Sequence, residues 1–238
     1  ASRHYAYDVL GPMVPLAVPL PRRRYPDPLV TTETWPAGPI ELAMPADGVF
    51  HCTTINVASG FTLRFTRNPL NTPVFLLATG AVTITGTIDL NGSANAGGAP
   101  GSGGPGGFDG GYGGFGIAAN TTGGDGQGPG GGRNVSQWWG AAYIATAGLN
   151  TNKYGNALCS PLIGGSGGGG GSGNPGNGGG GGGGAILIAA NTAITVTGTI
   201  RANGGTGQGG GSAGTIRLVS PLVNGGGDPT LPDTPVVA

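Results

Sequence analysis

The chain has 238 residues, of which 56 are glycine and 20 are proline; only 8% are charged, and the formal net charge is zero. This balance gives no electrostatic reason to expect nucleic acid or an anionic membrane surface as a partner. Without an apolar run of roughly 18 residues, no membrane span is expected. So much glycine and proline is typical of disorder, but dense apolar clusters and low charge favour an ordered chain.

Residues 1–47 form a proline-rich arm. Nine prolines between positions 12 and 45 prevent a helix and favour extended backbone. The apolar residues of the arm cannot form a core alone, so we expect it to lie along its own domain or along a neighbouring copy. The residues expected to make this contact are Val14, Leu16, Val18 and Leu20.

From Gly48 the sequence indicates β-strands. Residues 61–66 alternate apolar and polar side chains, as in a half-buried strand. Residues 74–78 are apolar throughout, which predicts a central strand covered on both faces. Residues 82–90 again alternate, and Asn91-Gly92 then leads into a glycine-rich stretch.

This unit is duplicated. Residues 185–203 repeat residues 73–91 at a constant offset of 112, with an identical GTI and the same alternation. Both copies belong to one expected core over residues 48–225, followed by a proline-rich tail, 226–238. The glycine-rich stretches of this core are 98–116, 164–184 and 204–214.

Glycine recurs at every third position from Gly98 to Gly116 and again from Gly164 to Gly182. Three residues per turn is the period of the polyproline II helix, and glycine once per turn leaves an edge on which another backbone can pack. A flexible linker is the alternative, but phased aromatic residues and flanking strands favour a packed layer. The aromatic side chains expected to form its contact face are Phe108, Tyr112 and Phe115.

The expected fold is all-β. No segment predicts a helix long enough to cover an apolar strand face, so strands must pack on strands. The core is therefore a strand sandwich or is β-solenoid-like, with glycine-rich polyproline II segments packed alongside and an extended N-terminal arm.

Residues 117–163 form an aromatic insert with three candidate ligand-binding residues, Trp138, Trp139 and Tyr143. Exposed tandem tryptophans suit a sugar or protein partner. The alternative, which we favour, is a small packed plug in which the tryptophans fill space.

Cys52 and Cys159 are the only cysteines, and they are candidates for one disulfide in an oxidising compartment. Two unrelated thiols are the alternative. The acidic residues are scattered and only two histidines occur, so we expect no catalytic residues, metal site or cofactor, and no enzyme.

The segment DGVFHCTTINVASGFTLRFTRNPLNTPVFLLATGAVTITGTIDLNGS, followed by GGPGGFDGGYGG, resembles secreted glycine-rich surface proteins of bacteria. The resemblance covers residues 47–116 and again 184–220, and it implies an exported β-rich protein without implying an activity. In composition and period alone, the glycine triplets are similar to arthropod antifreeze proteins built from polyproline II helices and to phage tail-tip adhesins.

Three functions follow as hypotheses. The first is a secreted structural protein at the cell surface, a homopolymer whose arm docks on the next copy in a filament, sheath or coat. The second is an adhesin that binds a surface glycan through the glycine-rich loops and the Trp138/Trp139 insert. The third is ice binding by rows of threonine at 83, 85, 87 and 195, 197, 199, which β-propensity explains more simply.

Overall fold

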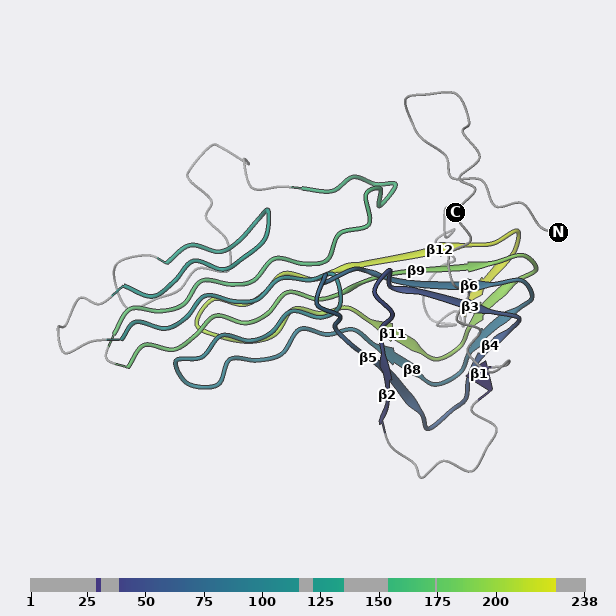
Figure 1. The fold of residues 1–238 in the computed structure, drawn as a ribbon, viewed down its shortest axis with the longest axis horizontal. Helices are drawn as coiled ribbons and strands as arrows, with labels where there is room; N and C mark the ends of the chain where they lie inside the picture. Colours follow the sequence, from purple (N-terminus) through teal and green to yellow (C-terminus); the bar gives the residue numbers. More distant parts are fainter. Residues whose placement is uncertain (1–28, 31–38, 116–121, 135–153, 174, 226–238) are drawn as a thin grey trace, which may run out of the picture.

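The structure is a computed structural model that describes residues 29–30, 39–115, 122–134, 154–173 and 175–225. These residues form thirteen β-strands and no helix. Figure 1 shows two parts: the strands gather at one side, and glycine-rich segments run side by side away from them.

The strands form three sheets in which every strand pair is parallel. Sheet I contains β1 (Leu29–Val30), β4 (Ile55–Val57), β7 (Val82–Ile84), β10 (Ile194–Val196) and β13 (Val223–Gly225). Sheet II contains β2 (Pro39–Ala43), β5 (Thr62–Thr66), β8 (Thr87–Asp89) and β11 (Thr199–Arg201). Sheet III contains β3 (Val49–Cys52), β6 (Val74–Ala78), β9 (Ala185–Ala190) and β12 (Thr215–Val219).

The chain visits the sheets in the fixed order I, II, III and then repeats the circuit, so each circuit adds one rung to a parallel β-solenoid. The all-β prediction is confirmed, and of its two arrangements the solenoid is present. The 112-residue duplication appears as two adjacent rungs in register. The paired residues of these rungs include Val74 and Ile186, Val82 and Ile194, and Thr87 and Thr199.

Inward-facing side chains from the three sheets form one apolar core. In β6, Val74, Leu76 and Ala78 are buried, whereas Phe75 and Leu77 point outward and are partly exposed. The strand predicted to be covered on both faces is therefore central in its sheet but fully covered on one face only. Burying each large apolar side chain stabilises the fold by roughly 1.5–3 kcal/mol.

Part of the predicted N-terminal arm belongs to the solenoid. All five residues of β2 pair with β5, from Pro39 with Thr62 to Ala43 with Thr66. The arm residues predicted to contact another surface, Val14, Leu16, Val18 and Leu20, lie outside the described residues.

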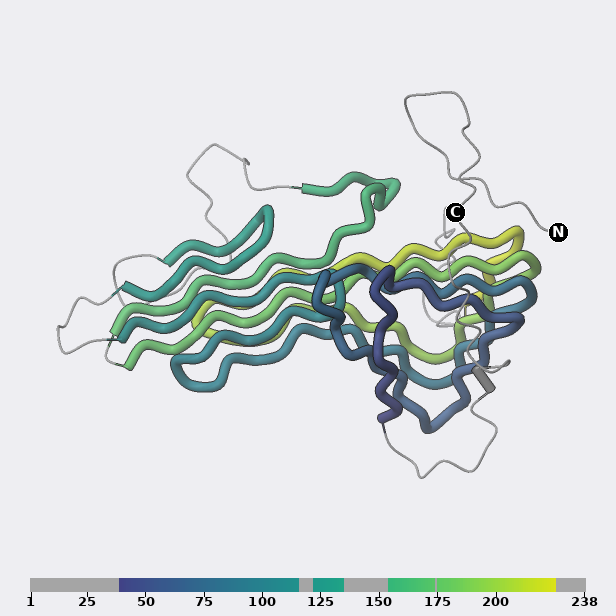
Figure 2. The backbone as a smooth tube through the Cα atoms, viewed as in Figure 1, coloured from purple at the N-terminus to yellow at the C-terminus, as the bar shows by residue number. Residues whose placement is uncertain are grey.

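The glycine-rich segments form a bundle that projects from the solenoid, and its segments lie between strands of sheet II and strands of sheet III in the chain. Residues 90–184 connect β8 to β9, and residues 202–214 connect β11 to β12 (Figure 2). Backbone hydrogen bonds join the segments at every third residue, as where Gly101 and Gly104 donate to Gly179 and Gly182. This is the period of polyproline II helices, which have no internal hydrogen bonds and must bond to neighbours. The predicted packed layer is present.

The segment 178–184 lies at the centre of the bundle, and all of its residues are buried glycines. Each backbone N–H donates to another segment at 2.7–3.0 Å. Six segments surround it: 90–97, 98–105, 106–114, 164–171, 202–206 and 208–215.

The number of packed edges explains the glycine content of each segment. A Cβ on Gly181 would overlap Ser102, one on Gly182 would overlap Gly165, and one on Gly183 would overlap Ala202. The central segment is thus closed on all three edges of its helix and admits glycine only. Residues 98–113 pack closely at every third position, so other residue types occur between those positions.

Candidate assembly interface

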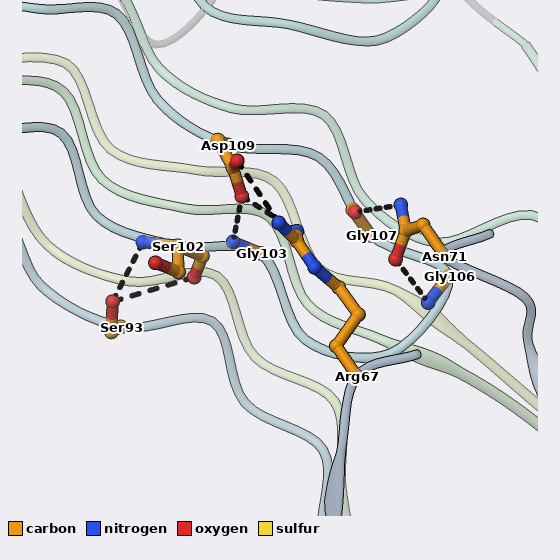
Figure 3. A network of polar contacts seen from close by, with 8 residues as sticks. All are labelled: Arg67, Asn71, Ser93, Ser102, Gly103, Gly106, Gly107 and Asp109. Atoms are coloured by element: carbon orange, nitrogen blue, oxygen red, sulfur yellow. Dashed lines mark hydrogen bonds and ion pairs between the residues drawn. The ribbon is translucent and has the colours of Figure 1, made fainter. Parts of the chain in front are cut away.

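The loop between β5 and β6 fastens the glycine bundle to the solenoid. The guanidinium of Arg67 donates to both carboxylate oxygens of Asp109, at 2.6 and 3.1 Å. The backbone N–H of Gly103 also donates to Asp109, at 2.8 Å. Figure 3 shows Arg67 reaching from the solenoid loop to this carboxylate.

Asn71 secures the same junction at the point where the glycine segment reverses. Its side-chain amide donates to the carbonyl of Gly107 at 2.7 Å, and its side-chain oxygen accepts from the N–H of Gly106 at 3.0 Å (Figure 3). Gly106 and Asn71 have φ values of 74° and 49°, in the left-handed region that glycine and asparagine adopt most easily. The loop therefore determines where residues 98–105 end and residues 107–115 begin.

The environment of Asp109 lowers its pKa. Burial acts in the opposite direction, but the hydrogen bonds from Arg67 and Gly103 and the positive charge of Arg67 outweigh it. The carboxylate is consequently ionised at neutral pH, and the ion pair forms between partly buried side chains.

Outward-facing side chains of sheet II form a row of alternating charge, which we call the charge ladder. Register pairs Glu41 with Arg64, Arg64 with Asp89, and Asp89 with Arg201. Arg64 and Asp89 form an ion pair at 2.8 Å. Glu41 accepts a hydrogen bond from Thr66 at 3.0 Å. Within the described part of the chain, Glu41 and Arg201 form no ion pair; each lies on an end strand and has an opposite charge on its inner side only.

The inward-facing row of the same sheet is more exposed at its ends. Register aligns Ile40, Leu63, Ile88 and Ile200. Leu63 and Ile88 are buried, whereas Ile40 and Ile200 are only partly buried. In sheet III, Ile216 of β12 is 38% exposed although its register partner Ile186 is fully buried. At these three positions the end strands lack the cover that a neighbouring rung gives to interior strands, whereas Phe50 on the end strand β3 is fully buried.

The three aromatic residues predicted as one contact face do not share one edge. Tyr112 and Phe115 are 61% and 67% exposed and lie three residues apart, on the same edge of their helix. Phe108 lies on another edge, where its ring packs against Gly128. The ligand-binding candidates Trp138, Trp139 and Tyr143 lie outside the described residues.

No disulfide joins Cys52 and Cys159. Cys52 ends β3, at one edge of sheet III, and Cys159 lines a hollow with Thr215 of β12, at the opposite edge. The predicted pairing is therefore absent.

That hollow carries no evident chemistry. None of the described residues that line it has a charged side chain, and the hydroxyl of Tyr154 is hydrogen-bonded to Ser166 and to the carbonyl of Gly164. Among the residues that the structure describes, no three of His, Cys, Asp or Glu gather as a metal site. Nor do these residues include a helix of the length and apolar character needed to cross a membrane.

Comparison with family models, curated proteins and solved structures found no match. The resemblance to bacterial surface proteins stays an expectation.

Sequence patterns alone did not predict the charge ladder or the Arg67–Asp109 junction. The 112-residue duplication aligns Asp89 with Arg201, so it could have predicted that these two opposite charges lie on neighbouring strands. Nothing in the sequence relates Arg67 to Asp109, because that contact depends on where the glycine segment reverses.

Proposed function

We propose that this chain is an extracellular structural protein without enzymatic activity, whose copies assemble into a filament, sheath or surface coat. The observation that carries the proposal concerns the two ends of the solenoid: no described strand pairs with the outer edges of β1, β2 and β3 or of β11, β12 and β13. The outer edge of an end strand is a template on which another chain can add a strand. Because the two ends differ, contacts between them are head-to-tail, and they generate open polymers where successive rotations do not close a ring.

The composition supports self-association. A net charge of zero provides no long-range repulsion between copies. In this proposal the N-terminal arm, residues 1–28, lies on a neighbouring copy and strengthens the polymer. The deletion that tests this role removes residues 1–28 only, because β1 and β2, which follow, are strands of the solenoid.

The experiment is electron microscopy and sedimentation of the purified full-length protein and of a variant that lacks residues 1–28. The proposal expects fibres or sheets from the full-length protein, and fewer or shorter ones after deletion. Monomers at every accessible concentration would contradict assembly, and unchanged polymers after deletion would contradict the role of the arm alone.

A second candidate is an adhesin, which the exposure of Tyr112 and Phe115 favours. Two aromatic side chains on one edge of a rigid bundle suit stacking on a sugar or on a protein surface. Glycan-array binding by the wild type and by the Tyr112→Ala/Phe115→Ala variant, with Leu70→Ala as a control at another exposed apolar residue, distinguishes this function. Equal binding by all three proteins excludes the edge as the site.

A further inference from the structure

We infer that successive copies stack end to end as one continuous solenoid, in which β11 and β12 of one copy pair in parallel with β2 and β3 of the next. This inference rests on the proposed self-assembly and specifies its interface. The partner is a second copy of this chain, and the charge ladder, the inward-facing rows and the strand count of the sheets each support that choice.

The charge ladder continues across such a junction. Along sheet II the order is Glu41, Arg64, Asp89, Arg201. The charge ladder therefore ends in a negative charge on β2 and in a positive charge on β11. Extending the register by one rung places Arg201 beside Glu41 of the next copy. Opposite charges on directly opposed strand positions are favourable, and like charges there are unfavourable.

The apolar rows also continue. If the registers of sheets II and III are extended, Ile200 would meet Ile40 of the next copy, and Leu218 would lie beside its Phe50, which is already fully buried in the single copy. Ile40, Ile200 and Leu218 are partly exposed, and burying them gives the junction a core that resembles the interior rungs.

The unequal strand count determines how sheet I joins. Sheet I has five strands, whereas sheets II and III have four. A copy added with a four-rung spacing would bring β13 to the position that β1 of that copy occupies beside β4. In the stack β13 therefore replaces β1, pairing Asn224 with Asn56 of the next copy and continuing the row formed with Thr83 and Thr195.

Charge reversal tests the junction. Glu41→Arg gives a chain with positive charge at both ends of the ladder, and Arg201→Glu gives one with negative charge at both ends. Each variant alone should require a roughly tenfold higher concentration to polymerise, because like charges meet at every junction. An equimolar mixture should polymerise near the wild-type concentration, since alternation of the two chains pairs opposite charges at each junction.

Controls separate the possible causes. Arg217→Glu reverses a charge on β12, at the same end but off the ladder, and should change the assembly concentration far less than Arg201→Glu. Circular dichroism and thermal unfolding check that each variant is folded. If a reversal variant is unfolded, Glu41→Gln and Arg201→Gln replace it: wild-type assembly should weaken as salt increases, and assembly of the Gln variants should not.

The outcomes distinguish this inference from the proposed function. If folded single variants polymerise like the wild type, if the mixture is no better than either variant alone, or if the Gln variants keep the wild-type salt dependence, end-to-end stacking is wrong and self-assembly stands. If the wild type forms no polymer, both are wrong.

Discussion

At the residue scale, the glycine positions follow from which edges of each segment are packed. A threefold helix with neighbours on three edges has no room for any Cβ, and the segment 178–184 contains glycine only. Ordering glycine has the largest backbone entropy cost of any residue. Complete pairing of the buried N–H groups offsets that cost, because an unpaired buried donor is destabilising by about 1–3 kcal/mol.

Alanine substitution tests this explanation within the bundle. Gly182→Ala should destabilise the protein by about 3 kcal/mol, because its methyl group would overlap the carbonyl oxygen of Gly165. Gly210 has only one atom near its Cβ position, at 3.9 Å. Gly210→Ala should therefore stay within about 1 kcal/mol of the wild type. Chemical denaturation of both variants measures the difference. Equal losses in the free energy of unfolding would contradict the explanation that packed edges leave no room for a Cβ.

The junction between solenoid and bundle should weaken in acid. The pKa of Asp109 is lowered in the folded protein, so the stabilisation by its ionised form is present above the ordinary value of 3.8 and is lost as pH falls from there through the folded value. Asp109→Asn should lower the stability at pH 7 by about 1–2 kcal/mol.

Denaturation curves at pH 7 and below pH 4 measure this effect. The stability difference between wild type and Asp109→Asn should shrink in acid. Asp125→Asn, at an exposed position in the bundle, serves as the control. A constant difference at all pH values would show that charge on Asp109 does not hold the junction.

At the element scale, periodicity predicted the strands and the glycine layer, and the topology depended on long-range packing. Alternation located residues 61–66 and 82–90, and the offset of 112 placed two units in register. The sequence did not decide between sandwich and solenoid, because alternation is the same in both. It also placed residues 39–43 in the arm, since Pro39 and the flanking Pro36 and Pro45 obscured a strand whose partner, β5, lies 23 residues further along the chain.

Alanine substitutions at two isoleucines that are register partners show how much a neighbouring rung contributes to the stability of the fold. Ile186→Ala removes a fully buried side chain from an interior strand and should cost about 2–5 kcal/mol. Ile216→Ala, at the 38% exposed partner position on the end strand, should cost less than half as much in the monomer. Thermal or urea unfolding below the assembly concentration measures both, and equal costs would show that the end rung is already covered.

At the scale of the whole molecule, the structure consists of a solenoid, which repeats along its axis, and a glycine bundle, which projects from its side. The rungs stack along the solenoid, and the bundle extends sideways from two of them (Figure 1). A polymer along the solenoid would therefore display one glycine bundle per copy on its side. This arrangement would expose Tyr112 and Phe115 repeatedly along the fibre, so the structural and adhesive functions are compatible.

The axial repeat of the polymer, measured by electron cryo-microscopy of the purified full-length protein, tests the central claim most directly. Four rungs per copy at a strand spacing of about 4.8 Å give a repeat of roughly 19 Å along the fibre. A fibre with this repeat and with continuous β-strand spacing across the junctions is the predicted result. A protein that stays monomeric, or a fibre whose repeat is close to the roughly 24 Å of five strand layers, would contradict it.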